Sequence, residues 1–320
     1  MLTKNMYPTC AKTFRSWRLS NPEFHNFYYE MGSPVPFDVT LRDGLQGLSR
    51  NEQTYFTTNK KLEIYKDIVS RYEPKNIEIG SIVSEKVLPV FKDTLKIFET
   101  INTNQKANKI FIQNNYILIP NKEKLRDVIN NIYINYFSFI TSTSNSFQLK
   151  NTKMTLEESD KEIYEMLYQL NINTFRMQEP IVKLYVSCIN ECPIDGKIDN
   201  DFIVNRILQL SKMNIDNICL SDTCGTITLD DFEYIIETCL FFGLSPSKLS
   251  LHLHVKPDKV NEIRKIIHMA LDFKITNFDV SCLNTGGCSV TMDKNRLNPN
   301  LSYDLYYESF VRYIEKKCNI

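Results

Sequence analysis

Long apolar runs are missing from this sequence of 320 residues, and so is an excess of either charge. No stretch approaches the roughly 18 apolar residues of a membrane-spanning helix. The 38 lysines and arginines balance 38 aspartates and glutamates, whereas a nucleic-acid-binding surface needs a basic excess. The N-terminus lacks the apolar core of a secretory signal peptide, although its basic residues leave an organelle presequence open. We therefore predict neither a membrane nor a nucleic-acid partner.

Matched pairs of cysteines are missing too. The nine cysteines are an odd number scattered through a large chain. This argues against a disulfide framework and predicts a reducing compartment such as the cytoplasm. Cys188 and Cys192, in CINEC, have a spacing compatible with half a zinc site. The sequence offers no matching second pair, so we do not assign zinc to these two residues.

Short β-branched runs alternate with longer amphipathic runs along the chain. The expected strands are 37–41, 76–79, 109–113, 133–140, 182–187, 217–221, 249–255 and 277–282. The expected helices are 52–72, 85–99, 121–131, 155–170, 200–213, 229–242, 258–273 and 303–317. Eight such units predict an α/β fold, a (β/α)8 TIM barrel over residues 36–320, with residues 1–35 as an N-terminal arm. A doubly wound sheet is disfavoured because no Gly-rich phosphate turn follows the first strand.

Histidine is scarce, with four in the chain, yet two stand one residue apart in SLHLHV, residues 250–255. Residues i and i+2 of a strand point to the same face, so we expect His252 and His254 to share a face. Two hydrogen-bonded histidines on a half-exposed strand would give the same pattern. Imidazole is also the commonest metal ligand in proteins, so a pair of metal ligands is the alternative.

Polar residues collect where the expected strands end, which is the end of a TIM barrel that carries its chemistry. In chain order they are Arg42, Asp43, Glu78, Asp222, His252, His254 and Cys288. Burying such side chains without partners would cost several kcal/mol each. A bound dication would offset that cost by organising the carboxylate and both imidazoles. Mixed histidine and carboxylate ligands favour Mg²⁺ or Mn²⁺, with Zn²⁺ as a further option.

Six motifs resemble those of one known family. TLRDGLQ, IEIGS, YVSCINECPIDGKI, SDTCGTIT, HLH and GGC follow the order and rough spacing of 3-hydroxy-3-methylglutaryl-CoA (HMG-CoA) lyase. That family belongs to the metal-dependent TIM-barrel lyases, which also include isopropylmalate and homocitrate synthases. The resemblance spans residues 36–315. It implies an acyl-CoA substrate and retro-Claisen cleavage of HMG-CoA to acetoacetate and acetyl-CoA, as in leucine catabolism and ketone body formation.

The resemblance also implies which residues bind metal and substrate. The metal ligands would be Asp43, His252, His254 and Asn300. Arg42 would polarise the thioester carbonyl and stabilise the enolate that develops. Gln46 would help to hold Arg42 and the substrate, and Ser81 would contribute to substrate binding.

Three further residues have implied roles in the chemistry. Glu78 and Asp222 would tune the ligands and the proton positions, and Cys288 would lie on a Gly-rich loop that closes over the site. Residue types alone support part of this scheme. Asp43 or His252 is suited to take the proton of the tertiary hydroxyl, and a thiol such as Cys288 is suited to protonate the enolate.

The chain departs from the family pattern at five points. Val255 and Ser289 stand where the family has Asp and Pro, and Asn284-Thr285 stand where it has Gly-Leu. The segment from Cys288 to Asn300 is longer than expected. RDGLQ is followed by Gly47-Leu48-Ser49 instead of polar residues near the CoA phosphates. We therefore expect an intact metal site with altered CoA recognition and loop closure.

Other functions stay open at this point. A related acyl-CoA lyase, a condensing enzyme or a 2-oxo-acid aldolase would use the same metal site on a different substrate. A degenerate barrel would serve as a non-catalytic scaffold, although the groups that it would be expected to lose are all present. The Tyr-rich helix expected at 303–317 is a candidate contact for a homodimer.

Overall fold

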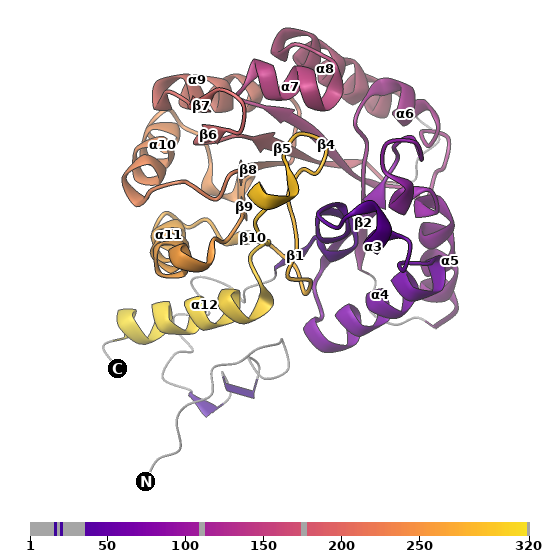
Figure 1. Cartoon of the computed structure of the whole chain (residues 1–320), viewed down its shortest axis with the longest axis horizontal. Coiled ribbons are helices and arrows are strands. Elements are labelled where there is room, and N and C mark those ends of the chain that lie inside the picture. Colours follow the sequence, from indigo (N-terminus) through magenta and orange to yellow (C-terminus); the bar gives the residue numbers. More distant parts are fainter. Residues whose placement is uncertain (1–15, 18–19, 22–35, 109–112, 174–177, 319–320) are drawn as a thin grey trace.

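A closed barrel of eight parallel strands forms the centre of the molecule. The computed structural model describes residues 16–17, 20–21, 36–108, 113–173 and 178–318. The strands pair in the order β1-β10-β9-β8-β5-β4-β3-β2, with helices around the outside (Figure 1). They are β1 (Phe37–Asp38), β2 (Asn76–Ser81), β3 (Asn114–Leu118), β4 (Tyr136–Ser142), β5 (Ile181–Ser187), β8 (Asn217–Asp222), β9 (Leu249–Leu253) and β10 (Asn277–Val280). The predicted (β/α)8 barrel is thus confirmed. The expected N-terminal arm lies almost entirely outside the described residues.

Eight helices follow the strands among the described residues. They are α4 (Thr58–Tyr72), α5 (Thr94–Asn108), α6 (Lys122–Arg126), α8 (Leu156–Ile172), α9 (Asn200–Leu210), α10 (Leu229–Phe241), α11 (Val260–Asp272) and α12 (Tyr303–Lys317). The shorter additions are α3 (Arg50–Gln53), α7 (Asn145–Thr152) and a hairpin of β6 (Glu191–Cys192) and β7 (Gly196–Lys197). Local sequence sets several of the starts. At α8, Thr155 accepts from the Glu158 N–H, and the Glu158 carboxylate accepts from the Thr155 N–H, which satisfies two otherwise free donors.

The second and third units differ from their expected boundaries. Most of the strand expected at 109–113 lies outside the described residues, and β3 begins at Asn114. β3 contains two asparagines, yet Asn114 pairs with Asn76 of β2 and Asn115 accepts a hydrogen bond from Tyr65 at 2.9 Å. Tertiary pairing therefore outweighs the weak strand propensity of asparagine. The helix expected at 85–99 begins at Thr94 instead, because a 3₁₀ turn that starts at Pro89 precedes it.

Alternation along the strands separates an apolar layer beneath the helices from a barrel interior that mixes apolar and polar side chains. In β5, Val182, Leu184 and Val186 belong to the main hydrophobic core, which packs beneath the helices. Lys183 alternates with them, and its buried ammonium pairs across the barrel with Asp279 of β10. The interior of this barrel therefore carries buried charge, and the functional site lies at one end of that interior.

Asp38 makes a pH-dependent contribution to stability. Burial raises the pKa of its carboxyl to about 7, although Thr40 and Tyr303 donate hydrogen bonds to it. The native carboxyl keeps its proton at pH values where the unfolded chain, with a pKa near 3.8, has lost it. The free energy of unfolding therefore falls as the pH rises from about 4 to about 7. We expect Asp38→Asn to remove this component. The urea midpoint of the variant, relative to wild type, should rise between about pH 5 and about pH 7.5, and a constant difference would contradict the assignment.

The tyrosines of α12 are not a free surface. Tyr303, Tyr306, Tyr307 and Tyr313 are at most 3% exposed within their own chain. The prediction that a Tyr-rich face of this helix forms a dimer contact is therefore wrong, because the barrel already covers that face. A homodimer through another surface stays a prediction.

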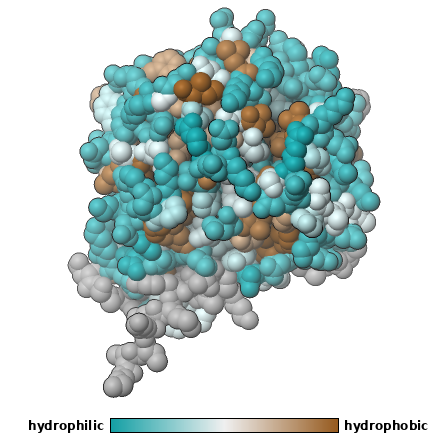
Figure 2. Space-filling view, viewed as in Figure 1, coloured by the Kyte–Doolittle hydropathy of each residue, from teal (hydrophilic) through white to brown (hydrophobic). Residues whose placement is uncertain are grey.

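The outer surface is predominantly hydrophilic in the view of Figure 2, with several separate apolar patches. No helix in the described part of the chain combines the length and apolar character that a membrane span requires.

Candidate active site and metal centre

Asp43, His252 and His254 converge in one buried cluster. Asp43 lies in a short π-helical turn, Thr40–Gly44, that directly follows β1. His252 belongs to β9 and His254 follows it, and both Nε2 atoms face the Asp43 Oδ2 atom, at 3.7 Å and 3.6 Å. One ligand atom from each residue lies within 4.8 Å of the others. The shared face predicted for the two histidines is thus what the structure has.

Each imidazole is oriented through its second nitrogen. The Nδ1 atom of His252 lies 3.1 Å from Asp279 Oδ2, and the Nδ1 atom of His254 lies 2.9 Å from the backbone carbonyl of Asp222. Both contacts fit an Nδ1–H donor, which leaves the Nε2 lone pairs toward Asp43. Hydrogen bonds of this kind fix the tautomer of metal-binding histidines.

Asn300 lies beside His254 and is a candidate for a further oxygen ligand. Its segment runs beside the end of β9, where His254 and Asn300 form an isolated antiparallel bridge. The Asn300 Nδ2 atom donates to the Thr285 carbonyl at 3.1 Å. The Asn300 Oδ1 and His254 Nε2 atoms are buried and have no hydrogen-bond partner among the described residues. Unpaired buried acceptors beside a carboxylate are costly, and a cation bound among them would satisfy all of them. The residues therefore fit the metal centre that the sequence predicts.

Gly286 packs directly against Asn300, and this contact yields a prediction. A Cβ atom at Gly286 would lie 2.6–2.8 Å from the Asn300 side-chain amide, which is too close for any side chain. We expect Gly286→Ala to displace the Asn300 amide and weaken Mn²⁺ binding about tenfold or more. A Mn²⁺ titration followed by electron paramagnetic resonance measures this directly. Unchanged affinity in the folded variant would show that Asn300 is not a ligand.

Arg42 lies beside the cluster and is fixed by two carboxylates. Its Nε atom donates to Glu78 Oε2, and its Nη1 atom donates to Asp43 Oδ1 at 2.5 Å. Tyr185 also donates to Glu78 Oε2, at 3.1 Å, and its ring lies under the guanidinium at 4.9 Å. The remaining Nη2 atom makes no hydrogen bond to the described residues. Arg42 therefore presents a preorganised donor on a rigid support.

Electrostatics hold Asp43 in its ionised form. Burial alone would raise its pKa, but the Arg42 guanidinium and the two histidines keep that pKa well below its ordinary value. Burial would lower the pKa of His252, but hydrogen bonds to Asp279 and Asp43 raise it to about 9, so a cation that binds at Nε2 would have to displace a proton from this ring. The carboxylate of Asp43 is therefore negative at neutral pH and attracts a cation.

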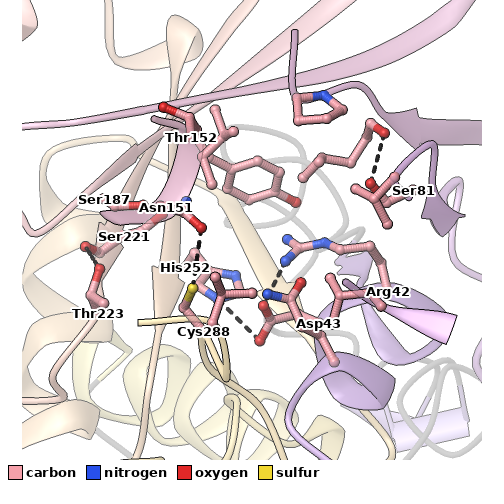
Figure 3. A pocket seen from close by; sticks show the side chains of 18 of the residues that line it. Arg42, Asp43, Ser81, Asn151, Thr152, Ser187, Ser221, Thr223, His252 and Cys288 are labelled. Carbon is pink, nitrogen blue, oxygen red and sulfur yellow. Dashed lines mark hydrogen bonds and ion pairs between the residues drawn. The ribbon is translucent and has the colours of Figure 1, made fainter. Parts of the chain in front are cut away.

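A loop that carries Cys288 lies across the site. The Gly287 N–H donates to Asp43 Oδ2 at 2.8 Å, and the Cys288 thiol lies 3.5 Å from Asn151 Oδ1 of α7. The Ser289 hydroxyl donates to the Gln46 carbonyl at 2.8 Å. Figure 3 shows the contact between Cys288 and Asn151, with His252 close to the thiol. Burial raises the pKa of the Cys288 thiol, so this group keeps its proton.

The departures from the family motifs fall in this loop and its surroundings. Val255 packs into the main core, and Ser289 supplies the contact to Gln46 described above. Lys294 lies 3.4 Å from Glu52, and Arg296 donates to the Pro193 carbonyl at 2.7 Å. The longer segment is therefore tied to helix α3 and to the turn between β6 and β7.

The other sequence-predicted residues lie at or near the same end of the barrel. Gln46 and Ser81 line the cavity together with Arg42, Asp43, both histidines and Cys288. The Ser81 hydroxyl donates to the Leu118 carbonyl at 3.0 Å. Asp222 contributes its backbone carbonyl to His254, whereas its carboxylate accepts from the Thr226 and Ile227 N–H groups at 3.0 and 3.1 Å. The Asp222 side chain thus holds the turn after β8.

Sequence reasoning missed several residues that contact the predicted ones. Tyr185 supports Glu78 and Arg42, Asn151 contacts Cys288, and Asp279 orients His252. Charged residues inside otherwise apolar strand runs were an available signal for two positions, Lys183 in IVKLYV and Asp279 in NFDV.

Comparisons with known proteins identify the family of this chain. The HMGL-like family model matches residues 34–257. The chain is 27% identical to the mitochondrial hydroxymethylglutaryl-CoA lyase of Arabidopsis thaliana over 251 residues, which is 78% of this chain and 49% of that protein. It therefore spans about half the length of that relative. It is 23% identical to the hydroxymethylglutaryl-CoA lyase of Pseudomonas mevalonii over 252 residues, or 79% of this chain and 77% of that protein.

A solved structure shows the same fold. An HMG-CoA lyase from Acinetobacter baumannii, in complex with coenzyme A and 3-methylmalate, matches with a TM-score of 0.70 and 22% identity, over 88% of this chain and 89% of that one. Since the family model covers more than half of the sequence, the chain belongs to the HMGL-like family.

Proposed function

We propose that this protein is a divalent-metal-dependent carbon–carbon lyase that cleaves HMG-CoA to acetoacetate and acetyl-CoA. The observation that carries the proposal is the convergence of Asp43, His252 and His254 beside the Arg42 guanidinium. The hydroxymethylglutaryl-CoA lyases among its relatives support the choice of substrate. Residues 36–320 would form the catalytic domain, with residues 1–35 as an N-terminal extension.

A metal ion would be held by four side chains. They are Asp43, His252, His254 and Asn300. When bound, Mg²⁺ or Mn²⁺ would act as a Lewis acid toward substrate oxygens and make the tertiary hydroxyl easier to deprotonate. Asp43 would take the hydroxyl proton, because His252 donates from Nδ1 to Asp279 and would bind the metal through Nε2, which leaves its ring no free lone pair.

Arg42 would stabilise the leaving enolate. Cleavage of the C2–C3 bond leaves an acetyl-CoA enolate whose charge gathers on the thioester oxygen. A fixed guanidinium donor aimed at that oxygen is a strong stabiliser in a buried site. Cys288 keeps its thiol proton and would deliver it to the enolate carbon. Glu78 and Tyr185 would act indirectly, because they hold Arg42 in place.

A second cavity supports an acyl-CoA substrate. It shares Val87, Leu88 and Val290 with the cavity over Arg42 and is lined further by Arg50 and Lys294. Apolar walls suit the pantetheine arm of coenzyme A, and the side chains of Arg50 and Lys294 suit the phosphates of coenzyme A. The A. baumannii lyase whose fold this chain shares was solved with coenzyme A bound. Arg50 and Lys294 would thus compensate for the missing polar residues after RDGLQ.

The test is turnover of HMG-CoA with added Mg²⁺ or Mn²⁺ and a thiol reductant. We expect acetoacetate to form with metal present, to stop on addition of a chelator and to resume when metal is restored. A 4-hydroxy-2-oxo acid assayed in parallel separates an aldolase from the lyase. Turnover of the oxo acid alone would move the function to that class, and metal binding without turnover of either substrate would remove the proposed reaction.

A further inference from the structure

A buried ion pair lies inside the barrel, next to the proposed metal centre, and the reaction described above does not use it. Lys183 of β5 pairs with Asp279 of β10, and their side chains are 2% and 0% exposed. β5 pairs with β4 and β8, whereas β10 pairs with β1 and β9. The two residues therefore reach one another across the barrel interior.

The Asp279 carboxylate joins this pair to the site. Its Oδ1 atom accepts from the Lys183 ammonium, and its Oδ2 atom lies 3.1 Å from His252 Nδ1. The opposite nitrogen of that imidazole, Nε2, lies 3.7 Å from Asp43 Oδ2. The side chains thus form a continuous chain from Lys183 through Asp279 and His252 to Asp43.

Aromatic rings fix the lysine end of this chain. The Lys183 ammonium lies 3.5 Å from the centre of the Phe37 ring and 4.8 Å from that of Tyr185. Such contacts hold a desolvated cation in place. Fixing the ammonium fixes Asp279, and fixing Asp279 sets which way the His252 ring turns.

Stability alone does not account for this pair. A buried ion pair that is replaced by apolar residues of similar size often leaves stability unchanged or improved. The contact to His252 supplies a functional reason, because groups that hydrogen-bond a metal-binding histidine fix its tautomer and raise its basicity.

We propose that Lys183 and Asp279 are positioning residues that keep the Nε2 atom of His252 directed at the metal position. The inference rests on the proposed metal centre. Neither residue would touch the substrate. Their effect would be on metal affinity, and through it on turnover.

The test is Mn²⁺ binding to the Lys183→Met/Asp279→Leu double variant. The two substitutions keep side-chain volume and remove both charges together, so neither charge is left buried alone. We expect the double variant to fold and its Mn²⁺ dissociation constant to rise about 10- to 100-fold, the usual cost of losing a hydrogen-bonding partner behind a ligand. Electron paramagnetic resonance of free Mn²⁺ reports this constant without any substrate.

A matched control separates positioning from general destabilisation. Lys61 of α4 and Asp93, which precedes α5, form another buried ion pair, with side chains 4% and 12% exposed, outside the barrel interior. Lys61→Met/Asp93→Leu should change the melting temperature but leave Mn²⁺ affinity within about threefold of wild type, since neither residue contacts a ligand. Lys183→Arg keeps the cation and should retain affinity.

The outcomes distinguish a failure of the proposed metal centre from a failure of the positioning role of Lys183 and Asp279. If wild type binds no Mn²⁺, the proposed centre fails. If wild type binds Mn²⁺ and the folded Lys183→Met/Asp279→Leu variant binds it equally well, the positioning role is wrong. If the double variant does not fold, the isosteric Asp279→Asn variant decides: weaker Mn²⁺ binding supports the role, and unchanged binding overturns it.

Discussion

Replacing Arg42 with glutamine is expected to lower kcat for HMG-CoA cleavage by about 10²–10³-fold. One preorganised donor at a developing oxyanion contributes an effect of this size. The guanidinium is held at its Nε and Nη1 atoms by Glu78 and Asp43, which leaves Nη2 for the enolate oxygen. Glutamine offers a neutral amide on a shorter side chain, so both the charge and the reach are lost. Steady-state release of acetoacetate at saturating Mn²⁺ measures the effect.

Two control variants test whether the lower kcat of Arg42→Gln comes from the lost guanidinium. Arg42→Lys keeps the charge but cannot bridge both carboxylates, so its kcat should lie between those of wild type and Arg42→Gln. Arg42→Gln also leaves Glu78 buried without its cation, which is destabilising. The Arg42→Gln/Glu78→Gln double variant removes that defect and should be equally inactive. Activity within about tenfold of wild type in either folded glutamine variant would contradict the assigned role.

His254→Ala is expected to abolish stoichiometric Mn²⁺ binding while the protein stays folded. The imidazole contributes its buried Nε2 atom, which has no hydrogen-bond partner among the described residues. Its other nitrogen contacts only the Asp222 carbonyl, so its loss removes little that the fold needs. Turnover should fall with metal occupancy. Equilibrium dialysis against Mn²⁺, with circular dichroism as the check on folding, measures both quantities.

His268 offers a matched control for that experiment. It is a half-buried histidine on α11 whose Nε2 atom contacts the Ser309 carbonyl at 2.9 Å, away from the cluster. His268→Ala should retain full Mn²⁺ content. Equal Mn²⁺ content in His254→Ala and His268→Ala would show that His254 is not a ligand.

Fold and site were predictable from the sequence to different degrees. Strand–helix alternation predicted the barrel because β-branched runs such as Val182–Ser187 and Asn217–Ser221 are strong local signals. The sequence did not predict a strand at β3, Asn114–Leu118, because the pairing of β3 depends on β2 and on Tyr65, both distant in sequence. The tyrosines of α12 were assigned to a partner, whereas they pack against their own barrel. Neither outcome could be read from local propensity.

The residues of the candidate site were likewise predictable to different degrees. Asp43, His252 and His254 stood out because motif and spacing carry their chemistry. Lys183, Tyr185 and Asp279 did not, because each acts through a residue on another strand, and only the closed barrel brings those strands together. Asp222 shows the converse case. A motif selected it, yet its carboxylate caps a turn and its backbone carbonyl orients His254.

The most direct test of the proposed reaction is cleavage of HMG-CoA in D₂O by Mn²⁺-loaded protein, with mass spectrometry of the acetyl-CoA formed. A retro-Claisen route passes through an enolate that Cys288 protonates, and its thiol exchanges with solvent. The account predicts acetoacetate and acetyl-CoA in equal amounts, with one deuterium in the acetyl methyl group. No acetyl-CoA, or acetyl-CoA without deuterium, would contradict it.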